Sequence, residues 1–383
     1  MTGPEGDAVD DADGTTGQPR VLLLVGHSAG GIGGHVAGLA RGLAGREVPV
    51  RVATSAATAA RFDFGPVPVT LAWPGGRPTP AGLAALRRLR AQVAGADVVH
   101  AHGHQAGLLA VLLAATVRRR PKVVVSWHNA VLGGGAGRRA RGLLEALQAR
   151  RADLVTGASA DLVDRARSLG ASAPRLAPVA APDAGSWTGD RAAARAELAA
   201  EVGVPETGPW LLTVSRVALQ KNLPDLVDAA ARLRDRDGLA WLVVGDGDPE
   251  LRARLAEQIG RTGAPVHLLG ARRDVARLMA LADLFVLTSA WEARALVVQE
   301  ALAAGTPVVT TAVGGLPELV GDAGVLVPPG RPAVLADAIG GLLDDDGRRS
   351  VLAEAGRKRF AELPDEEQVV SQWQQEYAAL LAW

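Results

Sequence analysis

The most informative part of the chain, residues 288–309, reads TSAWEARALVVQEALAAGTPVV. It follows one short apolar run and ends within another, and such runs are typical of buried strands. Between these runs we expect a loop that carries Glu292, and then a helix from about Ala295 to Ala304 that ends at Gly305. A strand, a helix and a further strand in this order form the repeating unit of a parallel α/β sheet.

Two glutamates make this unit a candidate ligand site. Glu292 precedes the helix N-terminus, where free N–H groups and the positive end of the helix dipole suit a phosphate. Glu300 lies about one turn inside a helix that is otherwise apolar, and a carboxylate there must be paired or hydrogen-bonded. The sugar hydroxyls of a nucleotide would supply that partner.

The same alternation of strand and helix continues on both sides of this unit. The expected strands are almost continuously apolar, which is typical of a parallel sheet covered by helices on both faces. Residues 177–185 are rich in Pro, Ala and Gly and predict a hinge, after which the alternation restarts. The sequence therefore predicts two doubly wound α/β domains that face each other across a cleft. The expected strands are residues 21–25, 48–53, 97–100, 123–127, 154–156, 210–214, 241–244, 266–269, 284–287, 307–310 and 325–327.

These patterns divide the chain into four parts. Residues 1–19 are acidic and rich in Gly and Thr, and we expect a disordered tail without the basic and apolar regions of a signal peptide. The two domains are expected to span residues 20–182 and 183–366, and residues 367–383 to form a C-terminal helix. The longest apolar run, residues 106–117, is too short to span a bilayer, so we expect a cytoplasmic protein.

Composition and charge exclude several classes of function. The chain has no cysteine, which excludes disulfides, cysteine-ligated metals and thiol nucleophiles. Its net charge is zero, but residues 20–183 hold 21 basic and 8 acidic side chains, whereas residues 184–383 hold 20 and 28. A basic half indicates an anionic partner, or arginines that only cover solvated faces. With one Tyr and four Phe in the chain, no mixture of basic and aromatic residues supports binding to nucleic acid.

Polar and glycine-rich residues follow several strands of the first half, where parallel α/β sheets bind their ligands. Gly30 and Gly31 open the helix after the first strand and suit a phosphate, or only a tight turn. The spacing is not G-x-G-x-x-G, and the strand at residues 48–53 ends without an acidic residue, so an NAD site is disfavoured. His128 follows the fourth strand and is either a contact in the cleft or an ordinary buried histidine. The three histidines of residues 100–104 lack a metal-ligand spacing.

The second half of the chain contains a candidate binding site made of cationic side chains. Arg216 and Lys221 lie five residues apart after the strand at residues 210–214. Both can converge on one diphosphate, the arginine as a planar fork and the lysine as a point charge, although ordinary surface charges would look the same. Residues 245–248, GDGD, indicate a metal-bridged nucleotide or a turn at a strand end, and we favour the turn.

Taken together, these residues resemble the retaining glycosyltransferases of family 4, which have the GT-B fold. The resemblance is strongest at Glu292 and Glu300, which are followed by ALAAGTPVV and then by GGLPELV. It covers about residues 20–380 and implies two facing Rossmann-like domains, with the C-terminal helix crossing back onto the first. The matching site positions, in chain order, are Gly30, Gly31, His128, Arg216, Lys221, Gly245, Glu292 and Glu300.

The resemblance implies a role for the residues of the second domain. Arg216 and Lys221 would clamp the diphosphate of a nucleotide sugar and stabilise the leaving nucleotide, so that neither a metal nor a cofactor is needed. Glu300 would bind the ribose hydroxyls. The remaining donor contacts would come from Gly245 and from Glu292, Ala293, Arg294, Ala295 and Leu296.

In this fold the first domain handles the acceptor. His128 would lie beside the reacting sugar, and Gly30 and Gly31 would approach the donor phosphate or the acceptor. Arginines mixed with apolar residues at 87–90 and 138–144 favour a lipid-linked or phosphorylated acceptor, and a peripheral contact with the anionic inner face of the membrane. Ordinary solvated helices are the alternative.

Two stretches depart from the family pattern. Glu292, Ala293, Arg294 and Ala295 stand where the family usually has Glu-Gly-Phe-Gly, so a guanidinium enters the region of the sugar pocket. We hypothesise that Arg294 pairs with an anionic group of the donor sugar or of the acceptor. The hinge also lacks the usual Asn-Gly-Val-Asp and reads AAPD at residues 180–183.

The expected activity is the transfer of a hexose from a UDP- or GDP-type sugar to the hydroxyl of an unknown acceptor. We expect His128, Arg216, Lys221 and Glu292 to be the catalytic residues. A nucleotide-sugar 2-epimerase would share the two facing domains and act without an acceptor. A non-catalytic nucleotide-sugar-binding protein would keep the cleft and lose the chemistry.

Overall fold

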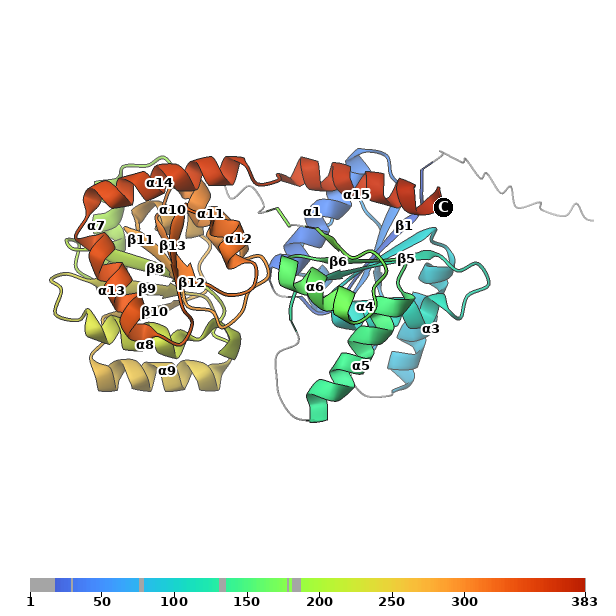
Figure 1. Cartoon of the computed structure of the whole chain (residues 1–383), viewed down its shortest axis with the longest axis horizontal. Coiled ribbons are helices and arrows are strands. Elements are labelled where there is room, and N and C mark those ends of the chain that lie inside the picture. The colour runs from blue at the N-terminus through green and yellow to red at the C-terminus, as the bar shows by residue number, and fades with distance from the viewer. Residues whose placement is uncertain are drawn as a thin grey trace, which may run out of the picture.

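The computed structural model describes residues 18–28, 30–75, 79–130, 136–177, 179–180 and 187–382, without the side chains of residues 136–140. Most of the expected tail and the centre of the expected hinge lie outside these ranges. Within them the chain forms two α/β domains that lie side by side, and the last helix runs from the second domain back to the first (Figure 1). The predicted class of fold is confirmed.

The first domain is built on a seven-stranded parallel sheet in the order β3-β2-β1-β4-β5-β6-β7. The five strands expected here are present, with ends that differ by at most two residues. Two further strands were not expected, because they are only three and two residues long and carry no buried apolar run. The strands are β1 Val21–Val25, β2 Val50–Thr54, β3 Val69–Leu71, β4 Val98–His102, β5 Lys122–Trp127, β6 Leu154–Gly157 and β7 Arg175–Leu176. The helices are α1 Gly31–Gly45, α2 Ala56–Ala59, α3 Pro80–Ala94, α4 His104–Ala114, α5 Ala136–Arg151 and α6 Ala160–Ser168.

The second domain has a six-stranded parallel sheet in the order β10-β9-β8-β11-β12-β13. All six strands coincide with the apolar runs of the sequence. They are β8 Trp210–Val214, β9 Ala240–Val244, β10 Val266–Gly270, β11 Leu284–Leu287, β12 Val308–Thr311 and β13 Gly324–Val327. The helical segments are α7 Arg191–Val202, η1 Leu219–Lys221, α8 Leu223–Arg232, α9 Pro249–Thr262, α10 Val275–Leu281, α11 Leu296–Ala304, α12 Leu316–Val320, α13 Pro332–Leu343 and α14 Asp346–Ala361.

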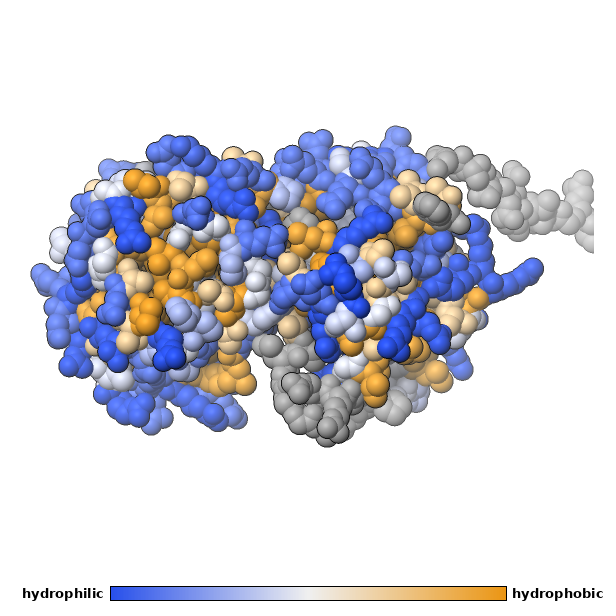
Figure 2. Space-filling model, in the orientation of Figure 1, coloured by the Kyte–Doolittle hydropathy of each residue, from blue (hydrophilic) through white to orange (hydrophobic). Residues whose placement is uncertain are grey.

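Each sheet is covered by helices on both faces, which explains its apolar strands. All five residues of β1 and of β9 are buried, because alternate side chains enter the apolar layers on opposite faces of the sheet. Hydrophilic residues cover most of the molecular face shown in Figure 2, and hydrophobic ones lie between them over both domains.

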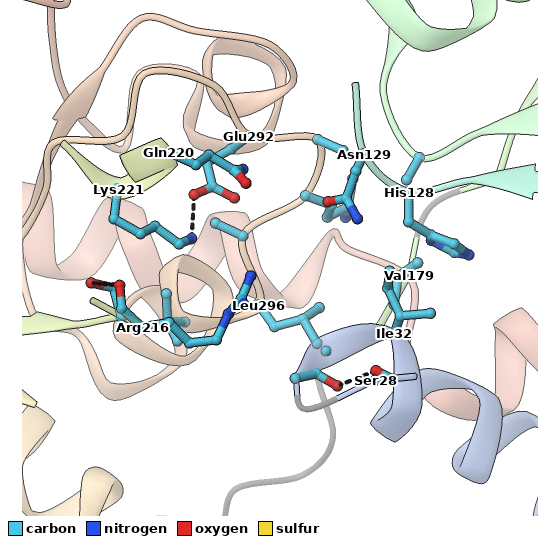
Figure 3. A pocket seen from close by; sticks show the side chains of 18 of the residues that line it. Ser28, Ile32, His128, Asn129, Val179, Arg216, Gln220, Lys221, Glu292 and Leu296 are labelled. Atoms are coloured by element: carbon cyan, nitrogen blue, oxygen red, sulfur yellow. Dashed lines mark hydrogen bonds and ion pairs between the residues drawn. The ribbon is translucent and has the colours of Figure 1, made fainter. Parts of the chain in front are cut away.

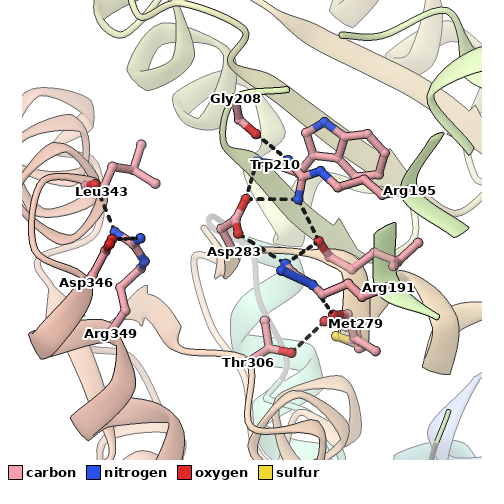
Figure 4. Close-up of polar contacts among 12 residues, drawn as sticks. Arg191, Arg195, Gly208, Trp210, Met279, Asp283, Thr306, Leu343, Asp346 and Arg349 are labelled. Atoms are coloured by element: carbon pink, nitrogen blue, oxygen red, sulfur yellow. Dashed lines mark hydrogen bonds and ion pairs between the residues drawn. The ribbon is translucent and has the colours of Figure 1, made fainter. Parts of the chain in front are cut away.

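Asp283 joins the amino ends of the central strands in the second domain (Figure 4). Its Oδ2 accepts a hydrogen bond of 2.8 Å from the backbone N–H of Trp210, the first residue of β8. Arg191 and Arg195 of α7 pair with the same carboxylate at 3.1 and 3.3 Å, and the Arg195 guanidinium lies 4.1 Å from the centre of the Trp210 ring. This network holds the end of the sheet that lies away from the cleft.

The last helix, α15 Glu366–Leu381, packs on α1 of the first domain. Trp373 and Tyr377 are buried in the core of that domain. The two helices approach closely at Gly42, where a Cβ atom would lie 2.4 Å from the side chain of Val370. The Tyr377 hydroxyl also lies 2.7 Å from Nδ1 of His100 in β4. α15 therefore fixes the second domain to the first by both apolar and polar contacts.

Candidate active site

A cavity of about 330 Å³ lies between the domains, at the carboxyl ends of both parallel sheets (Figure 3). Residues of the two domains meet there although they lie far apart in the sequence. Most of the residues singled out from the sequence line this cavity: Gly30, Gly31, His128, Arg216, Lys221, Glu292, Ala293, Arg294, Ala295 and Leu296.

The loop after β11 is held in place by polar contacts with the loop after β8. Lys221 and Glu292 form an ion pair that is largely removed from solvent. The Ser289 hydroxyl donates a second hydrogen bond of 2.7 Å to Oε1 of Glu292. Gln220 donates from Nε2 to the carbonyl oxygen of Trp291 at 2.7 Å. The cation and the carboxylate expected at the site therefore lie together.

Two helix N-termini border the cavity from opposite sides. α1 begins at Gly31 in the first domain, and α11 begins at Leu296 in the second. A Cβ atom on Gly31 would lie 2.9 Å from Cδ1 of Leu296, so a larger residue would displace the Leu296 side chain. The free N–H groups and dipoles of both helices favour an anion between them.

Two glycines press against the back of the Glu292 loop. Gly314 has a φ of 52°, and a Cβ atom there would lie 1.9 Å from the carbonyl oxygen of Glu292. Gly315 donates its backbone N–H to the same oxygen at 2.9 Å. The GGLPELV motif therefore shapes the main chain of the loop and supplies no side chain to the cavity.

His128 lies at the carboxyl end of β5 and belongs to a cluster of buried histidines. Its ring is adjacent to the rings of His35 and His102, with centroids 5.7 and 5.4 Å away. Burial lowers the pKa of His128 to about 3 and that of His35 to about 4. Both rings are therefore neutral near pH 7.

Two of the predicted residues do not line the cavity. Gly245, with a φ of 135°, lets β9 approach β8, because a Cβ atom would lie 2.0 Å from the carbonyl oxygen of Ser215. Glu300 lies one turn further along α11 than Leu296, and its carboxyl group has no hydrogen-bond or ion-pair partner among the described residues. Burial raises the pKa of Glu300 to about 7.

Arg294 is also incompletely paired. Its Nε and Nη2 are buried and have no hydrogen-bond partner in the described part of the chain. Burial lowers the pKa of its guanidinium to about 10, while the charge of Glu318 opposes this shift and that of Arg359 adds to it. Two unsatisfied buried donors are costly unless an acceptor reaches them.

The sequence patterns missed the contacts that join the two domains around the site. Trp291 donates from Nε1 to Oδ2 of Asp161, in α6 of the first domain, at 2.8 Å. Asn129 lines the cavity, and Gln220 and Ser289 hold the Glu292 loop. Asn129, Gln220 and Trp291 each stand next to a predicted residue, but only the tertiary structure shows what their side chains meet.

Within the described ranges, no group of three or more His, Asp or Glu side chains is placed to hold a metal ion. No helix in those ranges combines the length and apolar character needed to cross a bilayer.

Two doubly wound domains that face each other across a cleft are the architecture of the GT-B glycosyltransferases, and solved structures share it. The structure of Anabaena Alr3699/HepE with UDP and glucose matches 94% of this chain and 100% of its own, with a TM-score of 0.82 at 21% identity. Sucrose-phosphate synthase from Thermosynechococcus elongatus matches 94% of this chain and 99% of its own, with a TM-score of 0.80 at 24% identity.

Sequence comparison assigns the family. Residues 30–182 match a glycosyl transferase 4-like domain, and residues 208–345 match the glycosyl transferases group 1. The D-inositol 3-phosphate glycosyltransferase of Xylanimonas cellulosilytica is 34% identical, over 90% of this chain and 93% of its own length. The N-acetyl-alpha-D-glucosaminyl L-malate synthase of Bacillus anthracis is 33% identical over about half of each chain, 48% of this one and 49% of its own. The chain belongs to the group 1, family 4-like glycosyltransferases, as the sequence motifs indicated.

Proposed function

We propose that this glycosyltransferase moves a hexose from a nucleotide diphosphate sugar, of UDP or GDP type, to an acceptor hydroxyl with retention of configuration. The observation that carries the proposal is the cavity in which Arg216, Lys221 and Glu292 of one domain face His128 and the α1 N-terminus of the other. The Anabaena protein that shares this fold was crystallised with UDP-glucose, which supports a nucleotide-sugar donor.

The positive groups of the cleft suit the leaving diphosphate. Arg216 is exposed at the cavity, and Lys221 lies beside it (Figure 3). With the α11 N-terminus they would neutralise charge on the departing nucleotide without a metal ion. In the structure Lys221 is paired with Glu292. A bound diphosphate would compete for Lys221 and leave the Glu292 carboxylate free to accept hydrogen bonds from sugar hydroxyls.

Glu300 is proposed to bind the ribose. Leu296 and Glu300 are four residues apart on α11 and so lie on the same face of the helix, with Leu296 at the cavity wall. The unpartnered carboxyl group of Glu300 is raised in pKa by burial. Two hydroxyls that donate to it would stabilise its charged form and lower that pKa. Gly245 would contribute only by allowing β9 to approach β8.

The first domain is proposed to hold a phosphorylated or lipid-linked acceptor. Its helices α3, α4 and α5 pack side by side and expose Leu83, Leu112 and Leu143, and α3 also exposes Arg87 and Arg88. Exposed leucines beside arginines favour a peripheral contact with an anionic membrane. The Xylanimonas relative is a D-inositol 3-phosphate glycosyltransferase, which supports an anionic acceptor. Arg294, with two unpaired donors, is proposed to meet an anionic group of either substrate.

The first test is donor binding. Purified protein is mixed with UDP, GDP and ADP and with their sugar conjugates, in magnesium or in EDTA, and its thermal unfolding is followed. We expect stabilisation by one nucleotide, equal in both buffers; a hundredfold excess over Kd adds about 2.7 kcal/mol. Lys221→Met is expected to abolish this effect. Lys358→Met, at an exposed lysine of α14, is the matched control and is expected to keep it.

The second test is the reaction itself. With the selected donor and candidate phosphorylated acceptors, proton NMR of the product reports the anomeric configuration, which we expect to match that of the donor. Inverted product would refute retention. Conversion of the donor to its 2-epimer without an acceptor would favour an epimerase, and selective binding without turnover would favour a sensor. Failure of all three nucleotides to bind would refute the donor assignment.

A further inference from the structure

His102 and His128, at the carboxyl ends of β4 and β5, form a buried pair. The question is which nitrogen of each ring carries its proton. Nδ1 of His102 lies 3.1 Å from Nε2 of His128. The two rings are stacked, with centroids 5.4 Å apart and planes 16° apart. His35 of α1 is adjacent to both rings. One nitrogen of the pair must donate to the other, because a hydrogen bond needs one proton and one lone pair.

Both members of the pair are neutral near pH 7. Burial lowers the pKa of His102 well below its ordinary value and that of His128 to about 3, and neighbouring histidines add to both shifts. Each ring therefore carries one N–H. Either His102 donates from Nδ1 to His128, or His128 donates from Nε2 to His102.

The other nitrogen of His102 distinguishes these two arrangements. Nε2 of His102 is buried and has no hydrogen-bond partner within the described ranges. If His128 were the donor, the proton of His102 would lie on this Nε2 as an orphaned N–H. If His102 is the donor, Nε2 carries only a lone pair. Orphaned buried N–H groups are rarer than unsatisfied buried acceptors.

We propose that His102 is a positioning residue that donates from Nδ1 to His128 and holds its ring in the tautomer protonated on Nδ1. The hydrogen bond made by one ring nitrogen decides where the other proton lies. Nδ1 of His128 has no hydrogen-bond partner of its own in the described part of the chain, and His128 lines the cavity. The ring would then offer the cavity an N–H that can donate to a sugar oxygen, where the other tautomer would offer only a lone pair. The donation from His128 to a sugar oxygen rests on the proposed function, whereas the assignment of the His128 tautomer does not.

The tautomer can be measured directly in the full-length protein. Imidazole ¹⁵N labelling and long-range ¹H–¹⁵N correlation at pH 7.5 distinguish a protonated ring nitrogen from an unprotonated one, and comparison with His128→Gln assigns the signals. The expected result is a protonated Nδ1 and an unprotonated Nε2 in His128. Protonation on Nε2 would overturn the proposal, and no variant of His102 is needed to see it.

Two substitutions separate positioning from packing. His102→Asn keeps an N–H donor near the position of Nδ1, whereas His102→Phe fills the space without a donor. We expect the Asn variant to keep the His128 tautomer and most of kcat, and the Phe variant to lose the tautomer and about tenfold or more in kcat. Equal tautomers or equal kcat values in the two folded variants would contradict the idea. If no sugar nucleotide were turned over by the unmodified protein, the proposed function would fail while the tautomer result would stand.

Discussion

Acid is expected to destabilise this protein through its buried histidines. Burial lowers the pKa of His35 to about 4 and that of His128 to about 3, against about 6.5 in an unfolded chain. Below pH 6.5 the unfolded chain binds protons that the folded protein does not, so stability is full above that pH and is lost as the pH falls. From pH 7 to pH 5 each histidine lowers the free energy of unfolding by about 2 kcal/mol. Burial lowers the pKa of His100 and His102 as well, which adds to the loss.

Glu300 has the opposite effect on stability in acid. Burial raises its pKa to about 7, so the folded protein binds this proton before the unfolded chain does. The resulting stabilisation is full below the unfolded pKa and is lost as the pH rises through 7. From pH 7 to pH 5 it restores up to about 2 kcal/mol. The net loss from these three groups is then about 2 kcal/mol, a large share of the roughly 5–15 kcal/mol that stabilises a typical domain.

Guanidinium unfolding at pH 7 and at pH 5, followed by the fluorescence of the eight tryptophans, measures this difference. Glu300→Gln removes the opposing group, so the loss is expected to grow by up to about 2 kcal/mol. His35→Leu removes one histidine, and the loss is expected to shrink by about the same amount. If the unmodified protein and both variants each had the same free energy of unfolding at pH 5 as at pH 7, the burial argument would be wrong for this cluster.

Three further predictions follow from the site and its supports. Gly314→Ala is expected to abolish most glycosyl transfer because its Cβ atom would displace the Glu292 carbonyl. Gly321→Ala, at a similar φ of 53° but with open space around it, is expected to keep activity and lose about 1–3 kcal/mol of stability, as kinetics and unfolding curves would show. Tyr377→Phe removes the buried hydroxyl next to His100 and is expected to cost about 1–3 kcal/mol; an unchanged unfolding midpoint would contradict this. Arg294→Ala is expected to raise KM for an anionic substrate but not for its uncharged analogue, and unchanged kinetics with both would refute the role of Arg294.

Much of the fold could be predicted because it depends on local patterns. A strand covered on both faces must be apolar at nearly every position, so β1, β8 and β11 are visible in the sequence as short apolar runs. β3 and β7 were missed because an edge strand of two or three residues buries too little to leave such a run. The loop with Glu292 was predictable for the same local reason, since it joins an apolar strand to an apolar helix.

The site as a whole depends on contacts that no local pattern records. Trp291 meets Asp161 across 130 positions of sequence, and Gly31 meets Leu296 because the two domains close on each other. The hydrogen bond between His102 and His128 arises because β4 and β5 are neighbours in the sheet and end at the same edge. By itself the sequence determined where strands, helices and the loops of the candidate site occur, because burial on both faces requires apolar runs. The tertiary structure alone decided which of the predicted residues share a cavity, since that depends on how two separately folded sheets face each other.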